Sequence, residues 1–231
     1  MKPYAVGIDV GGSKIAAGLV SQDGKIVSRY HTQAHSEQQP ELVIEAIEQA
    51  YQAVLEKSGV DGLQVEAVGL GFGGNVNGPA GVVLVSSNLP AWNHVPLRDI
   101  VAERLGRPVL LDNDTNLCAL GEHRYGAGRG ATNMCYVTFS TGYGIGLIID
   151  GQLYVGHTGT AGELGHAVIE LNGPPCTCGK RGCLMAYASG IGISRMAYEK
   201  IEAGTETLLR ELAPAAGRRI SGELVAEATR R

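Results

Sequence analysis

The chain has 231 residues, of which 44% are hydrophobic and 18% charged, a composition typical of a globular domain that buries a core. Its net charge of −4 argues against a nonspecific nucleic-acid binder. The start has no signal-peptide pattern and no apolar run approaches the ~20 residues of a membrane span, so we expect a cytoplasmic protein that does not bind membranes. In a reducing compartment, three cysteines between Cys176 and Cys183 favour a metal or catalytic role over disulfides.

The first half of the chain alternates strand and helix patterns. In chain order the sequence predicts three short strands over residues 4–30, a helix over 40–57 that starts at Pro40, and a buried strand from Val65 into a glycine loop. A helix closed by Gly106, a strand ending near Asp112 and a helix over 115–125 follow.

The second half repeats the opening layout. Residues 133–155 again read as three short strands, and helical patterns follow over 192–204, 206–217 and 222–231. We therefore predict an α/β fold of two related halves, residues 1–115 and 116–231, with a boundary near 110–130. The second half lacks the later buried strand of the first and so reads as incomplete.

Two glycine-containing turns occupy equivalent places in the halves. The first is Asp9–Lys14, in which Asp9 can hold Mg²⁺ at the end of a strand. The backbone amides of Gly11 and Gly12, with the Ser13 hydroxyl, can approach phosphate oxygens. The alternative is a plain hairpin turn, and the spacing is not that of a P-loop. The second turn, Ser140–Gly144, favours two loops that hold one polyphosphate from two sides.

The polar run Asp112-Asn113-Asp114 ends a buried strand just before a helix. Asp114 can accept a proton from a substrate hydroxyl while Asn113 holds a neighbouring one. The alternative is helix capping, since Asp and Asn are favoured caps. Upstream, Asn88 and Trp92 together suit sugar binding, although a single Trp more often packs in the core.

The donor set His166, Cys176, Cys178 and Cys183 predicts a tetrahedral zinc site. All four positions would be filled by protein, which is the pattern of a structural site; the alternative is a metal-free loop of reduced cysteines. Glu163 lies three residues before His166, so a fixed His166 would also hold Glu163 where it can bond substrate hydroxyls.

These motifs together resemble the ROK (repressor, open reading frame, kinase) family of bacterial sugar kinases. The resemblance rests on Asp9–Lys14, Asn88-Leu89-Pro90, Asn113-Asp114, Gly162–His166 and the cysteine cluster. It implies a duplicated ribonuclease-H-like fold, also called actin-like ATPase or hexokinase-like, with sugar and ATP bound in an interdomain cleft.

The resemblance also implies roles for individual residues. Asp114 would be the general base for the sugar 6-hydroxyl in a glucokinase-like phosphotransferase that uses ATP, Mg²⁺ and a structural Zn²⁺. The implied sugar-binding residues are Asn88, Asn113, Asp114, Glu163 and His166. The implied nucleotide and magnesium residues are Asp9, Gly11, Gly12, Ser13, Lys14, Thr141 and Gly142. Family members form dimers and tetramers, so a homo-oligomer is compatible with the resemblance.

Two departures from the family pattern leave alternatives open. The family usually has Cys-Leu-Glu where this chain has Cys183-Leu184-Met185, and that Glu contacts sugar. Family members also continue for several dozen more residues. The alternatives are a non-catalytic sugar-binding or regulatory protein and a truncated kinase fragment. A DNA-binding repressor is less favoured, because the first loop begins at Asp9. The hexose, and ATP against polyphosphate as donor, stay open.

Overall fold

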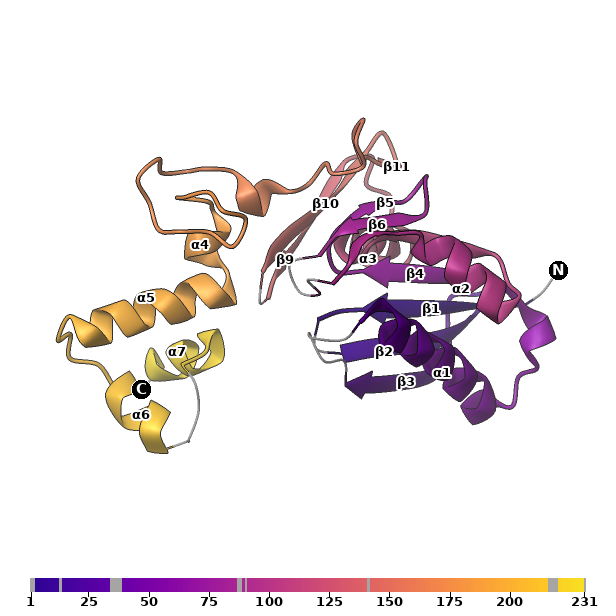
Figure 1. Cartoon of the computed structure of the whole chain (residues 1–231), viewed down its shortest axis with the longest axis horizontal. Helices are drawn as coiled ribbons and strands as arrows, with labels where there is room; N and C mark the ends of the chain where they lie inside the picture. Colours follow the sequence, from indigo (N-terminus) through magenta and orange to yellow (C-terminus); the bar gives the residue numbers. More distant parts are fainter. Residues whose placement is uncertain are drawn as a thin grey trace. The chain divides into compact units, whose positions relative to one another are not determined.

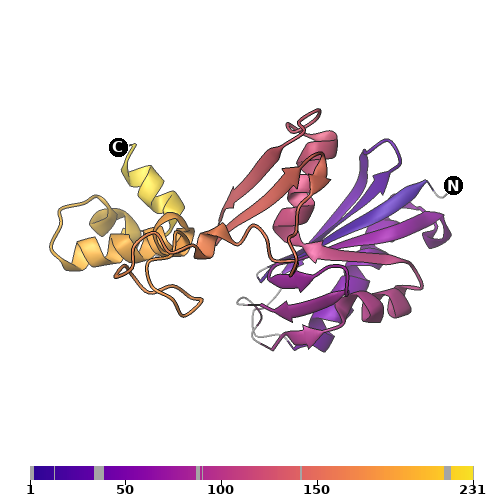
Figure 2. The same cartoon turned by 90° about the horizontal axis from the view of Figure 1, so that it is seen from above.

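The computed structural model describes residues 3–12, 14–33, 39–86, 89, 91–140, 142–215 and 220–230. The sequence-predicted site residues Ser13, Asn88 and Thr141 lie outside these ranges. The chain forms two compact units (Figures 1 and 2). The first unit comprises residues 1–136 and 146–161, and the second comprises 137–145 and 162–231.

A five-stranded sheet forms the centre of the first unit. Its strands are β1 (Tyr4–Val10), β2 (Lys14–Ser21), β3 (Ile26–Gln33), β4 (Val65–Phe72) and β8 (Val109–Asn113), in the order β3-β2-β1-β4-β8. The first three strands are antiparallel, as the turn pattern predicted, and β4 and β8 run parallel to β1. The carboxyl ends of β1, β4 and β8 therefore meet at one edge.

Alternating residues of β1 separate the two faces of this sheet. Val6, Ile8 and Val10 are buried, and they pack in one core with helices α1 (Pro40–Ser58) and α2 (Leu97–Leu105). α2 ends at Gly106, as the sequence predicts, and α1 ends one residue after the predicted position 57; Gly59 and Gly106 both adopt the left-handed conformation that ends a helix.

Trp92 is fully buried in this core, with its ring centroid 4.5 Å from that of Phe72. The packing alternative for Trp92 is therefore confirmed, and this side chain offers no surface for a sugar.

The opposite face of the sheet carries helix α3 (Asp114–Tyr125). Gly71 of β4 shows the closeness of this contact, because a Cβ there would lie 3.3 Å from Leu117 Cδ1 and 3.5 Å from Asp114 Cα. Asp9 points to the same face, since it is the register partner of Gly71. The α3 face of the sheet is therefore the one on which Asp9 and Asp114 lie.

A small antiparallel sheet was not predicted from the sequence. It consists of β5 (Asn75–Asn77), β6 (Val82–Val85) and β7 (Asn93–Val95), which follow β4 before α2 begins. The single-turn helix η1 (Gly62–Gln64) precedes β4. These strands have three or four residues each, too few for a period-2 pattern to stand out.

The predicted second three-stranded unit is present. Strands β9 (Met134–Phe139), β10 (Tyr143–Ile149) and β11 (Gln152–Leu153) pair in the order β11-β10-β9, which matches β3-β2-β1. The compact units do not divide at residue 115 or 116: α3 belongs to the first unit, while β9 and β10 each contribute residues to both units. The division into related halves at that point stays a prediction.

The remaining regular elements of the second unit are helices, joined by the long loop that contains the three cysteines. These helices are η2 (Leu164–His166), α4 (Met185–Ala188), α5 (Gly190–Glu202), α6 (Leu209–Ala215) and α7 (Gly222–Ala228). Ser221 caps α7 by accepting a hydrogen bond from the Leu224 amide, as the sequence predicts. Beyond β11 the described residues form no further strand. No helix in the described part of the chain is long and apolar enough to cross a membrane.

Candidate active site and metal centre

The carboxylates of Asp9 and Asp114 lie in the same region, at the carboxyl edge of the central sheet. Strand pairing aligns Asp9 with Gly71, and Gly71 with Asp112, so Asp9 and the start of α3 lie on either side of β4. The two carboxylates are close enough for the charge of Asp114 to raise the pKa of Asp9. This brings together two residues that are 105 positions apart in the sequence.

Among the described residues, Thr115 holds the Asp114 carboxylate through one oxygen. Its Oδ1 accepts hydrogen bonds from the Thr115 amide at 2.7 Å and the Thr115 hydroxyl at 3.3 Å. No other residue in the described ranges donates to its Oδ2. The carboxylate is therefore oriented by one oxygen while the other is available to a substrate hydroxyl.

The surroundings of the pair raise both pKa values. Burial raises the pKa of Asp114, and the hydrogen bonds from Thr115 oppose that change. Burial also raises the pKa of Asp9, the charge of Asp114 raises it further, and Lys14 acts in the opposite direction. A carboxyl group with a raised pKa is a stronger base once ionised, which suits general-base catalysis.

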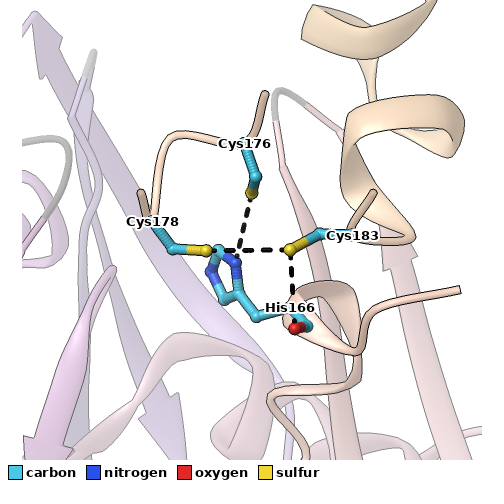
Figure 3. Close-up of side chains that lie close together, drawn as sticks. All are labelled: His166, Cys176, Cys178 and Cys183. Atoms are coloured by element: carbon cyan, nitrogen blue, oxygen red, sulfur yellow. Dashed lines mark hydrogen bonds between the residues drawn. The ribbon is translucent and has the colours of Figure 1, made fainter. Parts of the chain in front are cut away.

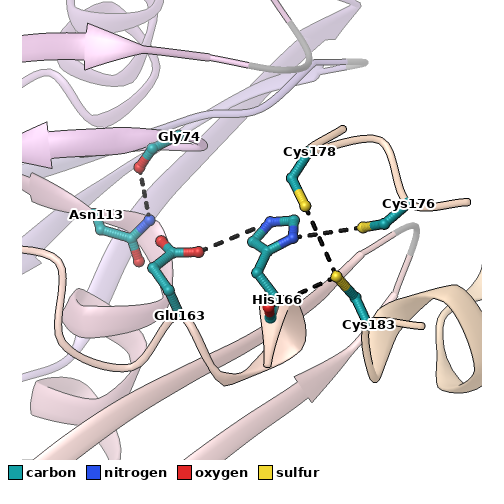
Figure 4. A network of polar contacts seen from close by, with 7 residues as sticks. All are labelled: Gly74, Asn113, Glu163, His166, Cys176, Cys178 and Cys183. Carbon is teal, nitrogen blue, oxygen red and sulfur yellow. Dashed lines mark hydrogen bonds and ion pairs between the residues drawn. The ribbon is translucent and has the colours of Figure 1, made fainter. Parts of the chain in front are cut away.

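Asn113 is engaged in holding the helix. Its Oδ1 accepts hydrogen bonds from the amides of Thr115 and Asn116, and its Nδ2 donates to the Gly74 carbonyl at 3.0 Å (Figure 4). The capping alternative is thus realised. The second N–H of the amide is still available for a hydroxyl, so a sugar-binding role for Asn113 stays a prediction.

Asp112 is likewise structural. Its Oδ1 accepts from the Asn113 amide and from Asn116 Nδ2 at 2.9 Å. The polar run after β8 therefore divides into two residues that build the helix start and one, Asp114, that is oriented by it.

The first loop is a tight turn in which one backbone amide is hydrogen-bonded within the turn. Gly11 N donates to the Lys14 carbonyl at 3.0 Å, so this amide closes the hairpin, as the plain-turn alternative requires. Gly12 N donates to no acceptor among the described residues. For Gly11 the geometry favours the turn, whereas Gly12 keeps the donor that a phosphate would need.

The four zinc-type donors converge in the second unit. His166 belongs to η2, Cys176 and Cys178 to the following loop, and Cys183 to the segment just before α4 (Figure 3). Their ligand atoms all lie within 4.8 Å of one another. Residues separated by up to 17 positions therefore present one nitrogen and three sulfurs to a common point.

Two of the separations between these donors match the edges of a tetrahedral zinc site. With Zn–S bonds of about 2.3 Å and Zn–N bonds of about 2.0–2.1 Å, the tetrahedral edges are about 3.8 Å for two sulfurs and about 3.6 Å for sulfur and nitrogen. Cys178 Sγ lies 3.7 Å from Cys183 Sγ, and Cys176 Sγ lies 3.5 Å from His166 Nδ1. The donors are thus placed for a small cation with soft ligands.

The two nitrogens of His166 face different partners. Nδ1 points to the cysteine cluster, while Nε2 lies 4.0 Å from Glu163 Oε2 (Figure 4). Burial, followed by the neighbouring thiols Cys176 and Cys178, raises the pKa of Cys183 to about 11. A bound metal cation would reverse that effect, because coordination deprotonates a thiol.

The second loop is closed by backbone contacts. Ser140 N donates to the Gly142 carbonyl at 3.0 Å, and the rings of Phe139 and Tyr143 on either side of it meet edge to face at 4.6 Å. The loop therefore has a defined start and end.

Sequence reasoning missed two glycines that allow close packing: Gly146 between β10 and α3, and Gly165 between η2 and β10. A Cβ on Gly146 would lie 2.5 Å from Ala119 Cβ, and a Cβ on Gly165 would lie 2.5 Å from the Tyr143 carbonyl oxygen. The sequence shows both glycines and their neighbours, but the residue that a glycine contacts lies far along the chain and cannot be read from the local pattern.

The fold and the paired carboxylates place the chain in the actin-like ATPase and hexokinase-like class. This agrees with the solved structure of a ROK family glucokinase from Streptomyces griseus in complex with glucose and AMPPNP. That structure has a TM-score of 0.83 and 38% identity, covering 98% of this chain and 71% of that one. The ROK family model matches residues 5–227, and the chain belongs to this family.

Two curated relatives show the range of functions in the family. The glucokinase of Thermotoga maritima is 41% identical over 208 residues, which is 90% of this chain and 64% of that protein. The xylose repressor of Bacillus spizizenii is 32% identical over 186 residues, 80% of this chain and 48% of that protein. The chain thus spans less than two thirds of the length of either relative.

Proposed function

We propose that the protein phosphorylates a hexose, of the glucose, N-acetylglucosamine or mannose type, at its 6-hydroxyl with ATP as donor. The observation that carries the proposal is the Asp114 carboxylate, oriented through Oδ1, open at Oδ2, raised in pKa and placed beside Asp9. Its support from relatives is the similarity to glucokinases, including one solved with glucose and AMPPNP.

In this proposal Asp114 Oδ2 accepts the proton of the 6-hydroxyl as that oxygen attacks the terminal phosphoryl group. Phosphoryl transfer depends mainly on positioning and on neutralising charge. The Thr115 hydrogen bonds keep the base in one orientation, and Asp9 would hold Mg²⁺, which neutralises phosphate charge when bound. The Gly12 amide and the second loop would bind the phosphates, while Glu163 and His166 Nε2 would bind sugar hydroxyls.

The test is ADP release by the 231-residue chain with Mg-ATP across glucose, N-acetylglucosamine, mannose, N-acetylmannosamine and fructose. Asp114→Asn is expected to lower turnover by about 10²–10⁴, the contribution of a positioned general base, with sugar binding retained. Asp150→Asn is the matched control, because Asp150 occupies an exposed turn of positive φ that Asn also tolerates. Full activity of Asp114→Asn would contradict the assignment of the base.

We also propose that His166, Cys176, Cys178 and Cys183 hold one structural zinc ion. The observation is the pair of donor separations, 3.7 Å and 3.5 Å, which match the edges of a tetrahedral site. Elemental analysis is expected to find about one equivalent per chain, since four protein donors complete the shell. A metal-free sample that is fully folded and binds sugar would contradict the structural role.

A non-catalytic sugar-binding or regulatory role is the second candidate. Met185 stands where the family usually has a sugar-contacting Glu, and its side chain cannot replace a carboxylate acceptor. The similarity to a xylose repressor is in line with this candidate. A folded, zinc-loaded chain that binds sugar but releases no ADP with any hexose of the panel would favour it.

A further inference from the structure

The zinc-type donors and the second loop are joined by two short backbone connections within the second unit. In the first connection, η2, which contains His166, packs against β10. In the second, the chain leads from Cys183 through α4 to the start of α5. The two connections reach opposite ends of the loop that contains Ser140 and Gly142.

In the first connection, the backbones of η2 and β10 are in direct contact, with no room for a side chain between them. A Cβ on Gly165, next to His166, would lie 2.5 Å from the Tyr143 carbonyl oxygen, and a Cβ on Gly162 would lie 2.2 Å from that of Ile145. Ordinary carbon–oxygen contacts are at least about 3.3 Å, so only glycine permits this packing. Any displacement of His166 along η2 is therefore transmitted to the residues that follow the second loop.

The second connection ends in a hydrogen bond. Cys183 pairs with Val168 in an isolated bridge, and the Leu184 amide donates to the Ala167 carbonyl at 2.9 Å, so this segment moves with η2. One short helix later, the Gly190 amide donates to the Ser140 carbonyl at 2.9 Å. The carbonyl at the start of the loop is therefore held by an amide seven residues after a zinc-type donor.

We infer that metal loading at the His166–Cys183 cluster holds the second loop in its conformation, and thereby tightens binding of the donor phosphates. Gly165 and Gly190 are the positioning residues of this coupling. The inference rests on the proposed function for the effect on nucleotide, but the effect on the loop stands on the contacts alone.

The primary test is amide exchange in the metal-free and zinc-loaded protein. Removing zinc with a chelator is expected to speed exchange of two amides, that of Ser140, which donates to Gly142, and that of Gly190, which donates to Ser140. The expected change is roughly two- to tenfold, the range for losing one net hydrogen bond. Amides of α7, which packs in a separate small core with Leu209 and Ile220, are expected to be unchanged. Unchanged exchange in the loop would overturn the inference, and so would loss of protection that extends through α7, because zinc would then stabilise the whole unit.

Two substitutions separate the coupling from zinc binding. Gly190→Pro removes the N–H that reaches Ser140 and places the ring Cδ against the Ser140 carbonyl, so an attractive contact becomes a repulsive one. The helix itself tolerates the change, because position 190 is the first residue of α5, where proline is favoured, and Ser189 is already extended. Gly165→Ala disturbs the other connection. Both are expected to retain zinc through the three thiolates while the loop exchanges rapidly with or without metal. Gly222→Ala, with no atom within 4 Å of its added Cβ, is the control and should behave as the parent.

Nucleotide binding distinguishes failure of this inference from failure of the proposed function. Calorimetric titration with Mg-ADP is expected to show binding roughly two- to tenfold weaker in the metal-free protein and in Gly190→Pro, following the loop. Equal Mg-ADP affinity with and without zinc would overturn the effect on the nucleotide. If Mg-ADP binds neither form while loop exchange follows zinc, the proposed donor fails and the coupling stands.

Discussion

Gly146 of β10 lies against helix α3, the helix that begins with Asp114, and its replacement by alanine tests how that base is positioned. In the first unit, a Cβ at this position would lie 2.5 Å from Ala119 Cβ and 2.8 Å from the Thr115 carbonyl oxygen. Both partners belong to the first two turns of α3, so the helix has to move to admit a methyl group.

The structure sets the size of the effect. Ordinary carbon–carbon contacts are about 3.5–4.0 Å, so α3 has to shift by about 1 Å. Overpacking costs about 1–3 kcal/mol, and the general gain from Gly to Ala offsets about 0.4–1 kcal/mol, which leaves a net loss of about 1.3 kcal/mol at the midpoints of the two ranges. A 1 Å error in placing a catalytic group can lower turnover about 10²-fold.

Two measurements test the expected losses of stability and of turnover. Trp92 is the single tryptophan and is buried in the core of the first unit, so its fluorescence in urea reports the free energy of unfolding of that unit. Turnover is measured with the best hexose of the panel. Gly121→Ala on the same helix is the control, because its Cβ would meet no atom within 4 Å. It should stabilise α3 by about 0.5–1 kcal/mol and leave turnover unchanged.

A compensating change makes the reasoning refutable. Ala119→Gly removes the nearest clash and leaves the contact with the Thr115 carbonyl, so the double variant Gly146→Ala with Ala119→Gly should regain part of the lost turnover. If Gly146→Ala keeps parental stability, α3 does not pack as described. If it loses stability but keeps full turnover, the contact does not position Asp114.

Four further predictions follow from the site. Asp114→Asn should lower the pKa of Asp9, measured by carboxyl NMR titration, because the charge of Asp114 is one cause of its rise; an unchanged pKa would contradict their proximity. The pKa values of Asp9 and Asp114 are both raised in the native state, so these two carboxyl groups favour the folded state at low pH and lose that contribution as pH rises through their native pKa values. Asp114→Asn should therefore raise the free energy of unfolding near pH 7 but not at acid pH. Asn113→Ala should cost about 1–2 kcal/mol in urea unfolding, because it removes a helix cap and the bond to Gly74; a smaller loss would show that water replaces the cap. Cys176→Ser should lower the zinc content found by elemental analysis, and full retention would show that this thiol is not a ligand.

Local order could be predicted from the sequence because it depends on neighbours along the chain. Pro40 begins α1, Gly106 ends α2, and the three short strands predicted over residues 4–30 are β1, β2 and β3. The donor types at His166 and the three cysteines were equally evident, since metal preference follows from residue chemistry.

The pairing of residues across the fold could not be predicted in this way. Asp112, Asn113 and Asp114 have similar chemistry in sequence, and only the packing of α3 on β4 shows that two of them build the helix start while Asp114 meets Asp9. Likewise, only the tertiary structure shows that Nδ1 is the nitrogen of His166 that faces the cysteines.

The sequence by itself thus determined the longer helices and strands, the repeated strand unit, the family and the candidate donors, because each depends on residue chemistry and short-range spacing. The tertiary structure alone decided that Trp92 is buried, that Asp114 is oriented through one oxygen, and that Gly146 and Gly165 permit backbone contacts. These depend on atoms brought together by strand register and helix packing, over separations along the chain that local pattern does not encode.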